Sequence, residues 1–167
     1  MNINLRNAIL EDIPILQHWD KQQHVIDCDP EDDWDWSEML VEEKEWQKML
    51  VAELNGRAIG FVQIIDPYLE ETNYWGEIEQ NLRAIDIWIG EATDLGKGYG
   101  TVMMNLAIEK CFSNEKVKAI VIDPLETNVL AIKFYKKLGF KFVAKREFTK
   151  GYMSEVLRLE RKECRQK

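Results

Sequence analysis

Alternation between hydrophobic and polar positions predicts that much of this chain forms short β-strands. The clearest case is at the start, where Ile3 and Leu5 alternate with polar residues. Asn55-Gly56 lies between two apolar runs and is a preferred sequence for a type I′ hairpin turn. In all, seven strands are expected, at residues 2–7, 49–54, 58–65, 82–90, 118–122, 140–148 and 152–159.

Hydrophobic residues at helical spacing predict four helices between these strands. Asp12 can cap the first helix, and the second starts at Asp35 or Ser37. The third follows a glycine-rich turn after the fourth strand. The fourth starts at the capping residue Asn128 and ends before Gly139, which suits the position just beyond a helix.

The resulting order of elements is β-α-α-β-β-β-α-β-α-β-β. Strands and helices in this order favour a single mixed α/β domain over residues 1–167, with one mixed sheet. The length is ordinary for one domain, and no repeat, low-complexity tract or flexible linker interrupts the pattern. A long loop is expected at 67–80, between the third and fourth strands.

The segment Leu95-Gly96-Lys97-Gly98-Tyr99-Gly100-Thr101 connects the fourth strand with the third helix. Glycines at such a turn leave backbone N–H groups open at the positive end of the helix dipole, where a phosphate can approach closely. A Walker loop is excluded by spacing, because five residues separate Gly90 from Gly96 and Lys97 is followed by Gly98. The dinucleotide fingerprint also fails, because its third glycine is missing. The turn predicts another phosphate-bearing cofactor, with a plain structural connection as the alternative.

Composition places the chain among ordinary cytoplasmic proteins. No apolar stretch approaches the roughly 20 residues of a membrane helix, and the first residues do not open a signal peptide. The three cysteines, Cys28, Cys111 and Cys164, are far apart and lack metal-binding spacing, which indicates reduced thiols. His18 and His24 have no partners at ligand spacing, so surface roles and no metal site are expected.

Acidic residues give the chain a net charge of −8 and are concentrated in two segments. Between Asp27 and Glu38 lie seven acidic residues, no basic residue, and the indoles of Trp34 and Trp36. The loop at 67–80 repeats this acidic and aromatic combination. Such a field disfavours nucleic acid and favours a cationic small molecule. A solvated acidic loop is the alternative, but two indole rings there need something to cover them.

Asp86 is the one acidic residue in the apolar strand at 82–90. Alternation places Asp86 and Trp88 on one face and three isoleucines on the other. Loss of hydration raises the pKa of a carboxyl group in such a strand and makes it a better base. A carboxylate can hold an ammonium group and accept its proton, as acyl transfer to an amine requires. Asp86 is therefore a candidate catalytic base, the alternative being an acid exposed on a half-buried strand.

A second segment, Asn128-Val129-Leu130-Ala131-Ile132-Lys133-Phe134-Tyr135-Lys136-Lys137-Leu138-Gly139-Phe140, strengthens the cofactor interpretation. Together with the glycine turn it resembles the GCN5-related N-acetyltransferase (GNAT) superfamily. There the pattern (Gln or Arg)-x-x-Gly-x-(Gly or Ala) binds the pyrophosphate of coenzyme A. Leu95 replaces the usual Gln or Arg, which removes one side-chain contact and leaves the backbone cradle. The resemblance spans nearly the whole chain and implies a GNAT fold with acetyl-CoA as cofactor.

The resemblance also implies roles for single residues. Tyr135 matches the usual general acid of the superfamily, and a tyrosine can give a proton to a departing thiolate; the alternative is an aromatic core residue. Backbone N–H groups near Trp88 and Ile89 would polarise the thioester carbonyl. The implied cofactor-binding residues are Trp88, Ile89, Leu95, Gly96, Lys97, Gly98, Tyr99, Gly100, Thr101 and Asn128.

Two shorter patterns resemble the aminoglycoside 6′-N-acetyltransferases within this superfamily. They are Ile85-Asp86-x-Trp88-Ile89-Gly90-Glu91 and Ile122-Asp123-Pro124 with Asn128; Ile87 replaces a frequent glutamine. The resemblance implies that Asp86 and Asp123 contact amines of the antibiotic and that Asp86 is the base. Carboxylates suit ammonium groups and indoles suit sugar rings. The expected substrate-binding residues are Trp34, Trp36, Glu71, Tyr74, Trp75, Glu79, Asp86 and Asp123, with Asp32 and Asp33 as further acidic candidates.

The leading hypothesis is direct transfer of an acetyl group from acetyl-CoA to the 6′-amine of an aminoglycoside. Another cationic amine, such as a polyamine, a lysine derivative or a protein N-terminus, would satisfy the same acidic loops. A non-catalytic acyl-CoA-binding or interaction module is the alternative from another class, and the presence of both Asp86 and Tyr135 disfavours it. The oligomeric state and the accepted aminoglycosides stay open.

Overall fold

The computed structural model describes residues 2–164. Its strands are β1 (Ile3–Asn7), β2 (Gln47–Leu54), β3 (Arg57–Ile65), β4 (Leu82–Ile89), β5 (Ala119–Ile122), β6 (Lys141–Thr149) and β7 (Tyr152–Glu160). Its α-helices are α1 (Ile13–Trp19), α2 (Gln23–Ile26), α3 (Trp36–Val41), α4 (Tyr99–Phe112), α5 (Val129–Lys137) and α6 (Arg161–Cys164), with short 3-10 helices at Leu10–Asp12 and Ala92–Asp94. Met1 and residues 165–167 of the expected domain lie outside the described residues, as does the side chain of Cys164. None of the described helices combines the length and the apolar character needed to cross a membrane.

The seven strands form one mixed sheet in the order β1-β2-β3-β4-β5-β7-β6. The predicted order of strands and main helices is confirmed, and the structure adds the single-turn helices α2 and α6. Asn55 and Gly56 have φ angles of 52° and 82°, as the predicted type I′ turn between β2 and β3 requires. Among the described strands, β4 and β5 are the one parallel pair.

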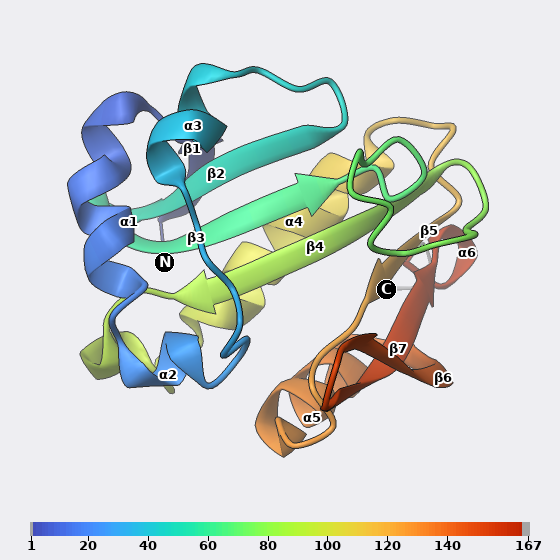
Figure 1. Ribbon diagram of the computed structural model, residues 1–167. Helices are drawn as coiled ribbons and strands as arrows, with labels where there is room; N and C mark the ends of the chain where they lie inside the picture. Colours follow the sequence, from blue (N-terminus) through green and yellow to red (C-terminus); the bar gives the residue numbers. More distant parts are fainter. Residues whose placement is uncertain (1, 165–167) are drawn as a thin grey trace.

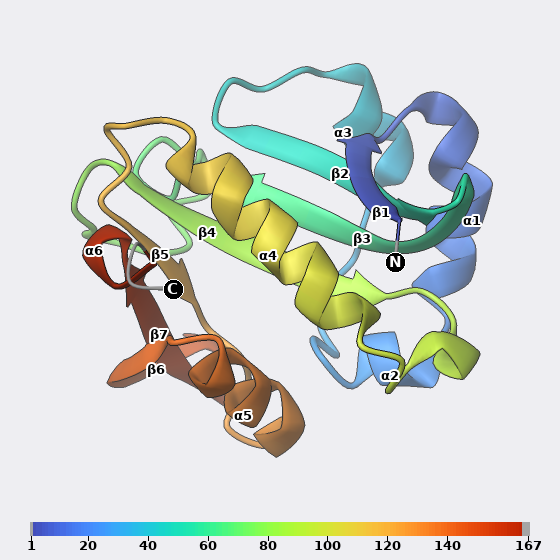
Figure 2. The same cartoon turned by 180° about the vertical axis from the view of Figure 1, so that it is seen from behind.

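Helices cover both faces of the sheet. α4 and α5 lie against one face, and α1, α2 and α3 lie against the other (Figures 1 and 2). Beneath α4 and α5, the main core includes Met103, Met104 and Tyr135 together with isoleucines such as Ile85 of β4. Burial of each side chain of this size contributes about 1.5–3 kcal/mol, so this core holds both helices on the sheet.

The opposite face carries two separate hydrophobic clusters. One contains Trp19, Trp36 and Phe61, each at most 1% exposed, and it holds α1 and α3 against β3. Trp88 of β4 packs against this cluster. The other cluster includes Ala84 of β4 and is covered by the loop between β3 and β4. Asp86 lies between Ala84 and Trp88 on the same face of β4, and therefore between the two clusters.

β4 and β5 pair over only three residues each, and the last pair is Ala84 with Val121. Beyond this pair the two strands diverge (Figure 1). Pro124 has no N–H to donate to a ladder, and its carbonyl accepts from the N–H of Glu155 on β7 at 2.9 Å. The chain after β5 thus follows β7 and leaves the C-terminal half of β4 open on that side.

Gly90, directly after β4, lies against the buried ring of Trp19. A methyl group on Gly90 would lie 2.0 to 2.4 Å from three atoms of that ring. Gly90→Ala is therefore expected to displace Trp19 and lower the free energy of unfolding by about 1–3 kcal/mol. Urea denaturation followed by tryptophan fluorescence measures the change. Gly100→Ala is the matched control, because its added carbon meets Phe134 at an ordinary 3.9 Å; an equal loss in both variants would contradict this packing argument.

Candidate active site

Two aspartates lie where β4 and β5 separate. Asp86 follows Ala84 by two residues, and Asp123 follows Val121 by two residues, so each lies just beyond the last paired position. Side chains two residues apart in extended chain point to the same face, which here is the face of α1, α2 and α3. The charge of Asp123 raises the pKa of Asp86, as proximity of the two carboxylates requires. The strand pattern predicted the face on which Asp86 lies. The pairing of β4 with β5 then brings Asp123 beside it.

Residues 27–35, which we call the strap, connect α2 with α3 and pass in front of the C-terminal part of β4 and of β3, beside this separation (Figure 1). Two side-chain contacts tie the strap to the far side. The amide of Asn128 donates to Sγ of Cys28 across 3.7 Å, and the hydroxyl of Tyr152 donates to Glu31 across 3.3 Å. The strap is thereby held against the start of α5 and the start of β7.

Four carboxylates share the site, those of Asp29 and Asp32 from the strap and those of Asp86 and Asp123. Loss of hydration, followed by the charges of the other three, raises the pKa of Asp86 well above its ordinary value. Burial raises the pKa of Asp123 to about 6, although a hydrogen bond from Tyr74 lowers it. Reduced hydration and the charge of Asp29 raise the pKa of Asp32 to about 7. Each carboxylate therefore favours a proton or another cation beside it.

Tyr135 of α5 belongs to the same site. Its side chain is 8% exposed, and within the described residues its hydroxyl has no hydrogen-bond partner. Burial, followed by the charges of carboxylates that include Asp86 and Asp123, raises the pKa of Tyr135. The hydroxyl therefore keeps its proton when the site is empty of cations. A cation beside the aspartates would offset that field and lower the pKa of Tyr135 again.

The glycine turn leads into α4 as predicted. Gly98 is the N-terminal capping residue with a left-handed φ of 82°, and no side chain caps the helix. The first N–H groups of α4 are thus left for an anion. A carbon added to Gly96 or Gly98 would meet nothing within 4 Å, so the turn is open. Asp94 beneath the turn binds the ammonium group of Lys97 at 3.0 Å and the guanidinium of Arg57 at 2.7 Å, which fixes its position.

The other predicted cofactor residues lie around this turn. Tyr99, Gly100 and Thr101 form the first turn of α4. Leu95 is 46% exposed, so its side chain is available to a ligand. Phe134 of α5 faces Gly100, which shows that the start of α4 and the helix bearing Tyr135 are neighbours. Asn128 caps α5 as predicted, its Oδ1 accepting from the N–H of Ala131 at 3.1 Å.

The open edge of β4 differs from the prediction in two respects: the position of His24 and the choice of available N–H groups. Nε2 of His24 donates to the carbonyl of Ile89 at 2.8 Å, so this histidine holds α2 against β4 and is partly buried. The N–H of Gly90 donates to β3. Because main-chain groups alternate between the two edges of a strand, the N–H of Trp88 also faces β3. The N–H groups of Ile87 and Ile89 face the open edge, so Ile87 replaces Trp88 as an available donor.

Two of the four aromatic residues expected to contact substrate are core residues. Trp36 is 1% exposed and Trp75 is 4% exposed, so neither ring offers a face to a ligand. In the folded protein, other parts of the chain cover these two rings, so no ligand is needed to cover them. Trp34 is half-buried and stacks on Trp36, with ring centroids 4.9 Å apart. Tyr74 is 42% exposed, and its hydroxyl donates to Asp123 at 2.6 Å.

Glu71 and Glu79 are not gathered with the other acids. Glu71 is paired with Lys44 at 3.1 Å, and Glu79 is paired with Arg158. Their charges are already compensated, and neither is among the groups that raise the pKa of Asp86. The strap supplies the additional acids instead.

Sequence reasoning missed residues whose partners are remote. Asp29 stood among seven acidic residues with nothing to single it out. His24 and its partner are 65 positions apart, and Arg57 lies 37 positions from Asp94. Only the folded chain brings such pairs together, so no local pattern indicated them.

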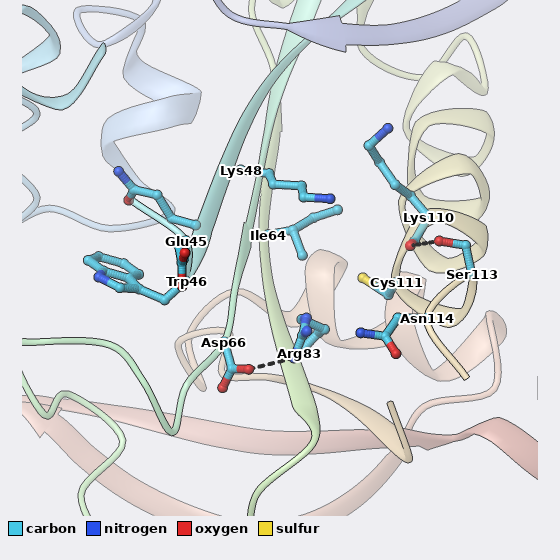
Figure 3. A pocket seen from close by; sticks show the side chains of 11 residues that line it. Glu45, Trp46, Lys48, Ile64, Asp66, Arg83, Lys110, Cys111, Ser113 and Asn114 are labelled. Carbon is cyan, nitrogen blue, oxygen red and sulfur yellow. Dashed lines mark hydrogen bonds and ion pairs between the residues drawn. The ribbon is translucent and has the colours of Figure 1, made fainter. Parts of the chain in front are cut away.

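A separate pocket lies beside the C-terminal end of α4, on the opposite face from Asp86 (Figure 3). Arg83 in its wall is already paired with Asp66 at 2.7 Å. Burial raises the pKa of Cys111, also in the wall, to about 12, so this thiol is unreactive. Cys28 and Cys111 are both free thiols. Over the described residues, no group of three or more histidine, cysteine or acidic side chains is arranged to hold a metal ion.

Comparisons with known proteins agree with this geometry. Residues 8–148 match the family model described as an acetyltransferase (GNAT) domain. The aminoglycoside N(6′)-acetyltransferase type 1 of Klebsiella pneumoniae is 28% identical over 154 residues, which cover 84% of this chain and 74% of that protein. The crystal structure of aminoglycoside acetyltransferase AAC(6′)-Ib with coenzyme A has a TM-score of 0.83 at 25% identity, covering 97% of this chain and 96% of the other. A second AAC(6′)-Ib structure, with paromomycin and acetyl-CoA, has a TM-score of 0.87 at 24% identity, covering 99% and 97%.

The crowded carboxylates make stability depend on pH. A carboxyl whose pKa is raised on folding stabilises the folded state at low pH, and this contribution is lost as pH rises through the folded pKa. For Asp32 the loss extends from the ordinary value near 3.8 to about 7. Asp32→Asn removes this pH-dependent loss of stability. The Tm of the variant should therefore exceed the Tm of the parent by more at pH 8 than at pH 5. After screening by solvent, a gain of about 2–4 °C is expected, equivalent to about 1 kcal/mol.

Thermal denaturation at pH 5, 6.5 and 8 measures this advantage. Asp33→Asn on the same strap is the matched control, because the carboxylate of Asp33 is not among the charges that raise the pKa of Asp32. Parallel Tm profiles for the parent and Asp32→Asn would show that folding does not raise the pKa of Asp32.

Proposed function

Because the chain belongs to the GNAT family of acetyltransferases, we propose that it transfers the acetyl group of acetyl-CoA to the 6′-amine of an aminoglycoside. The observation that carries the proposal is the meeting of Asp86, Asp123 and Tyr135 where β4 and β5 separate. A proton acceptor, a second carboxylate and a proton donor thus share one site. Similarity of most of the chain to the Klebsiella pneumoniae enzyme supports the choice of substrate.

The glycine turn fits the diphosphate of coenzyme A. The start of α4 is uncapped, and Gly96 and Gly98 leave open space where side chains would stand. Backbone N–H groups would hold the phosphates, because the ammonium group of Lys97 is already engaged by Asp94. The bound cofactor would supply an activated acetyl group. The N–H groups of Ile87 and Ile89 on the open edge of β4 are the available donors for a developing oxyanion.

Asp86 would take up the proton of the substrate. Its raised pKa makes the carboxylate a stronger base than an ordinary aspartate, so it can accept a proton from an ammonium group near neutral pH. Asp123 would hold the same or a neighbouring ammonium group. This cationic charge would lower the pKa of Tyr135, which could then give up the proton at its hydroxyl to a leaving sulfur.

Several carboxylates in one site suit a substrate with several ammonium groups. Asp29 and Asp32 of the strap would bind amines beyond the reacting one; Asp32 was a candidate from the sequence, and Asp29 is the acid added to those expected. Trp34, half-buried beside Trp88, would face a sugar ring with its remaining surface. A cytoplasmic location is part of this proposal, since the free cysteines are typical of a reducing compartment.

Release of coenzyme A, followed with a thiol reagent, tests the proposal directly. Turnover is expected with acetyl-CoA and kanamycin or tobramycin, each of which offers a 6′-amine. No turnover is expected with a matched aminoglycoside that carries a hydroxyl in place of that amine. Turnover with spermidine or a lysine derivative, but with no aminoglycoside, would contradict the substrate and keep the acetyltransferase chemistry.

Asp86→Asn should lower kcat by about 10²–10⁴-fold, because the variant keeps the shape of the side chain and loses the proton acceptor. The Kd for acetyl-CoA, measured by calorimetry, should stay within about twofold, since the glycine turn is untouched. Glu109→Gln, an exposed change on α4, is the matched control and should leave both values unchanged. An unaltered kcat in Asp86→Asn would rule out Asp86 as the base.

A further inference from the structure

Tyr74 makes a direct contact with the candidate substrate site. It lies in the loop between β3 and β4, and its hydroxyl donates to Oδ2 of Asp123 at 2.6 Å. The sequence assigned Tyr74 to the substrate as an aromatic platform. In the structure its polar end is instead engaged by a carboxylate that would itself bind substrate.

Stacking fixes the ring of Tyr74. It lies parallel to Phe148 of β6, with centroids 4.7 Å apart and an interplanar angle of 9°. The guanidinium of Arg146 lies over the ring of Phe148, 4.6 Å from the ring centroid. It also donates to the carbonyl of Trp75 at 3.0 Å. Since Trp75 is a core residue, the hydroxyl of Tyr74 is positioned by a chain of contacts that ends in the core.

Asp123 must be ionised to hold an ammonium group. Its surroundings are mostly unfavourable to that charge, because burial and nearby negative charge raise the pKa to about 6. The hydrogen bond from Tyr74 is the largest influence in the other direction. Burial and the adjacent carboxylates raise the pKa of Tyr74 itself, so its hydroxyl remains a donor throughout the working range of pH. The titratable or charged groups facing Asp123 are Tyr74 of the loop, Arg146 of β6, Asp86 of β4, Asp29 of the strap and Tyr135 of α5.

We propose that Tyr74 is a positioning residue, whose stacked ring and hydroxyl hold the carboxylate of Asp123 in the orientation and the ionised form that receive an ammonium group beside Asp86. The proposal rests on the proposed function, because it concerns binding of the cationic substrate. It assigns Tyr74 a role through Asp123 and no role in proton transfer.

Tyr74→Phe tests the proposal because it keeps the stacked ring and removes the hydrogen bond. Loss of the bond should raise the pKa of Asp123 by about one unit, so protonation begins at higher pH. The acid limb of the pH profile of kcat/KM for the aminoglycoside should move upward by a similar amount. At pH 6 the KM for the aminoglycoside should rise about three- to tenfold, whereas at pH 8.5 the two proteins should agree within about twofold. The KM for acetyl-CoA should not change.

A substrate-free measurement separates this inference from the proposed function. Carbon-13 NMR of the aspartate carboxyl groups follows the titration of Asp123, which is identified by the signal lost in Asp123→Asn. The signal should titrate at higher pH in Tyr74→Phe than in the parent. Tyr68→Phe, an exposed tyrosine in the same loop, is the matched control and should leave the titration in place. Phe148→Leu, which removes the stacking partner, should move the titration in the same direction by a smaller amount.

An unchanged titration and an unchanged acid limb in Tyr74→Phe would overturn the role of Tyr74 while turnover of aminoglycoside by the parent continues. Absence of turnover by the parent, with a shifted titration of Asp123, would instead overturn the proposed substrate and keep the link between Tyr74 and Asp123. A general loss of kcat at every pH would show that the hydroxyl serves some purpose other than holding Asp123.

Discussion

The separation of β4 from β5 is the constraint on which the site depends. Parallel pairing ends at Ala84 and Val121, and Pro124 directs the following chain along β7. A continuous ladder would occupy the main-chain groups on this edge of β4 and would leave no place for a ligand between the strands. With the strands apart, donors on β4 stay open, while the register of the last pairs keeps Asp86 near Asp123.

Concentrated negative charge at the site opposes folding, and contacts at both ends of the strap offset it. Trp34 stacks on the buried Trp36 at one end of the strap, while Cys28 meets Asn128 at the other. These contacts hold the strap, with its acids, over carboxylates that repel it. Such an arrangement is typical of functional sites, where stability is reduced in favour of ligand binding. A cationic substrate relieves the repulsion, so binding and stability are linked at this site.

Features that depend on neighbouring residues alone were predictable from the sequence. Asn55-Gly56 forms the expected turn because both residues tolerate positive φ. Gly98 leads into α4, and Asn128 caps α5 with its own side chain, since each needs only the residues that follow it. The face of Asp86 followed from the two-residue period of a strand. The order of strands and main helices was correct for the same reason.

The sequence by itself determined which side chains can carry acid–base chemistry and where a phosphate can approach the backbone. Tertiary structure decided which of those groups are available. It buried Trp36 and Trp75, paired Glu79 with Arg158, and turned the hydroxyl of Tyr74 towards the site carboxylates. Availability depends on partners tens of residues away along the chain. How deeply a group is buried, and how strongly it is paired, depend on distances that exist only once the sheet has formed.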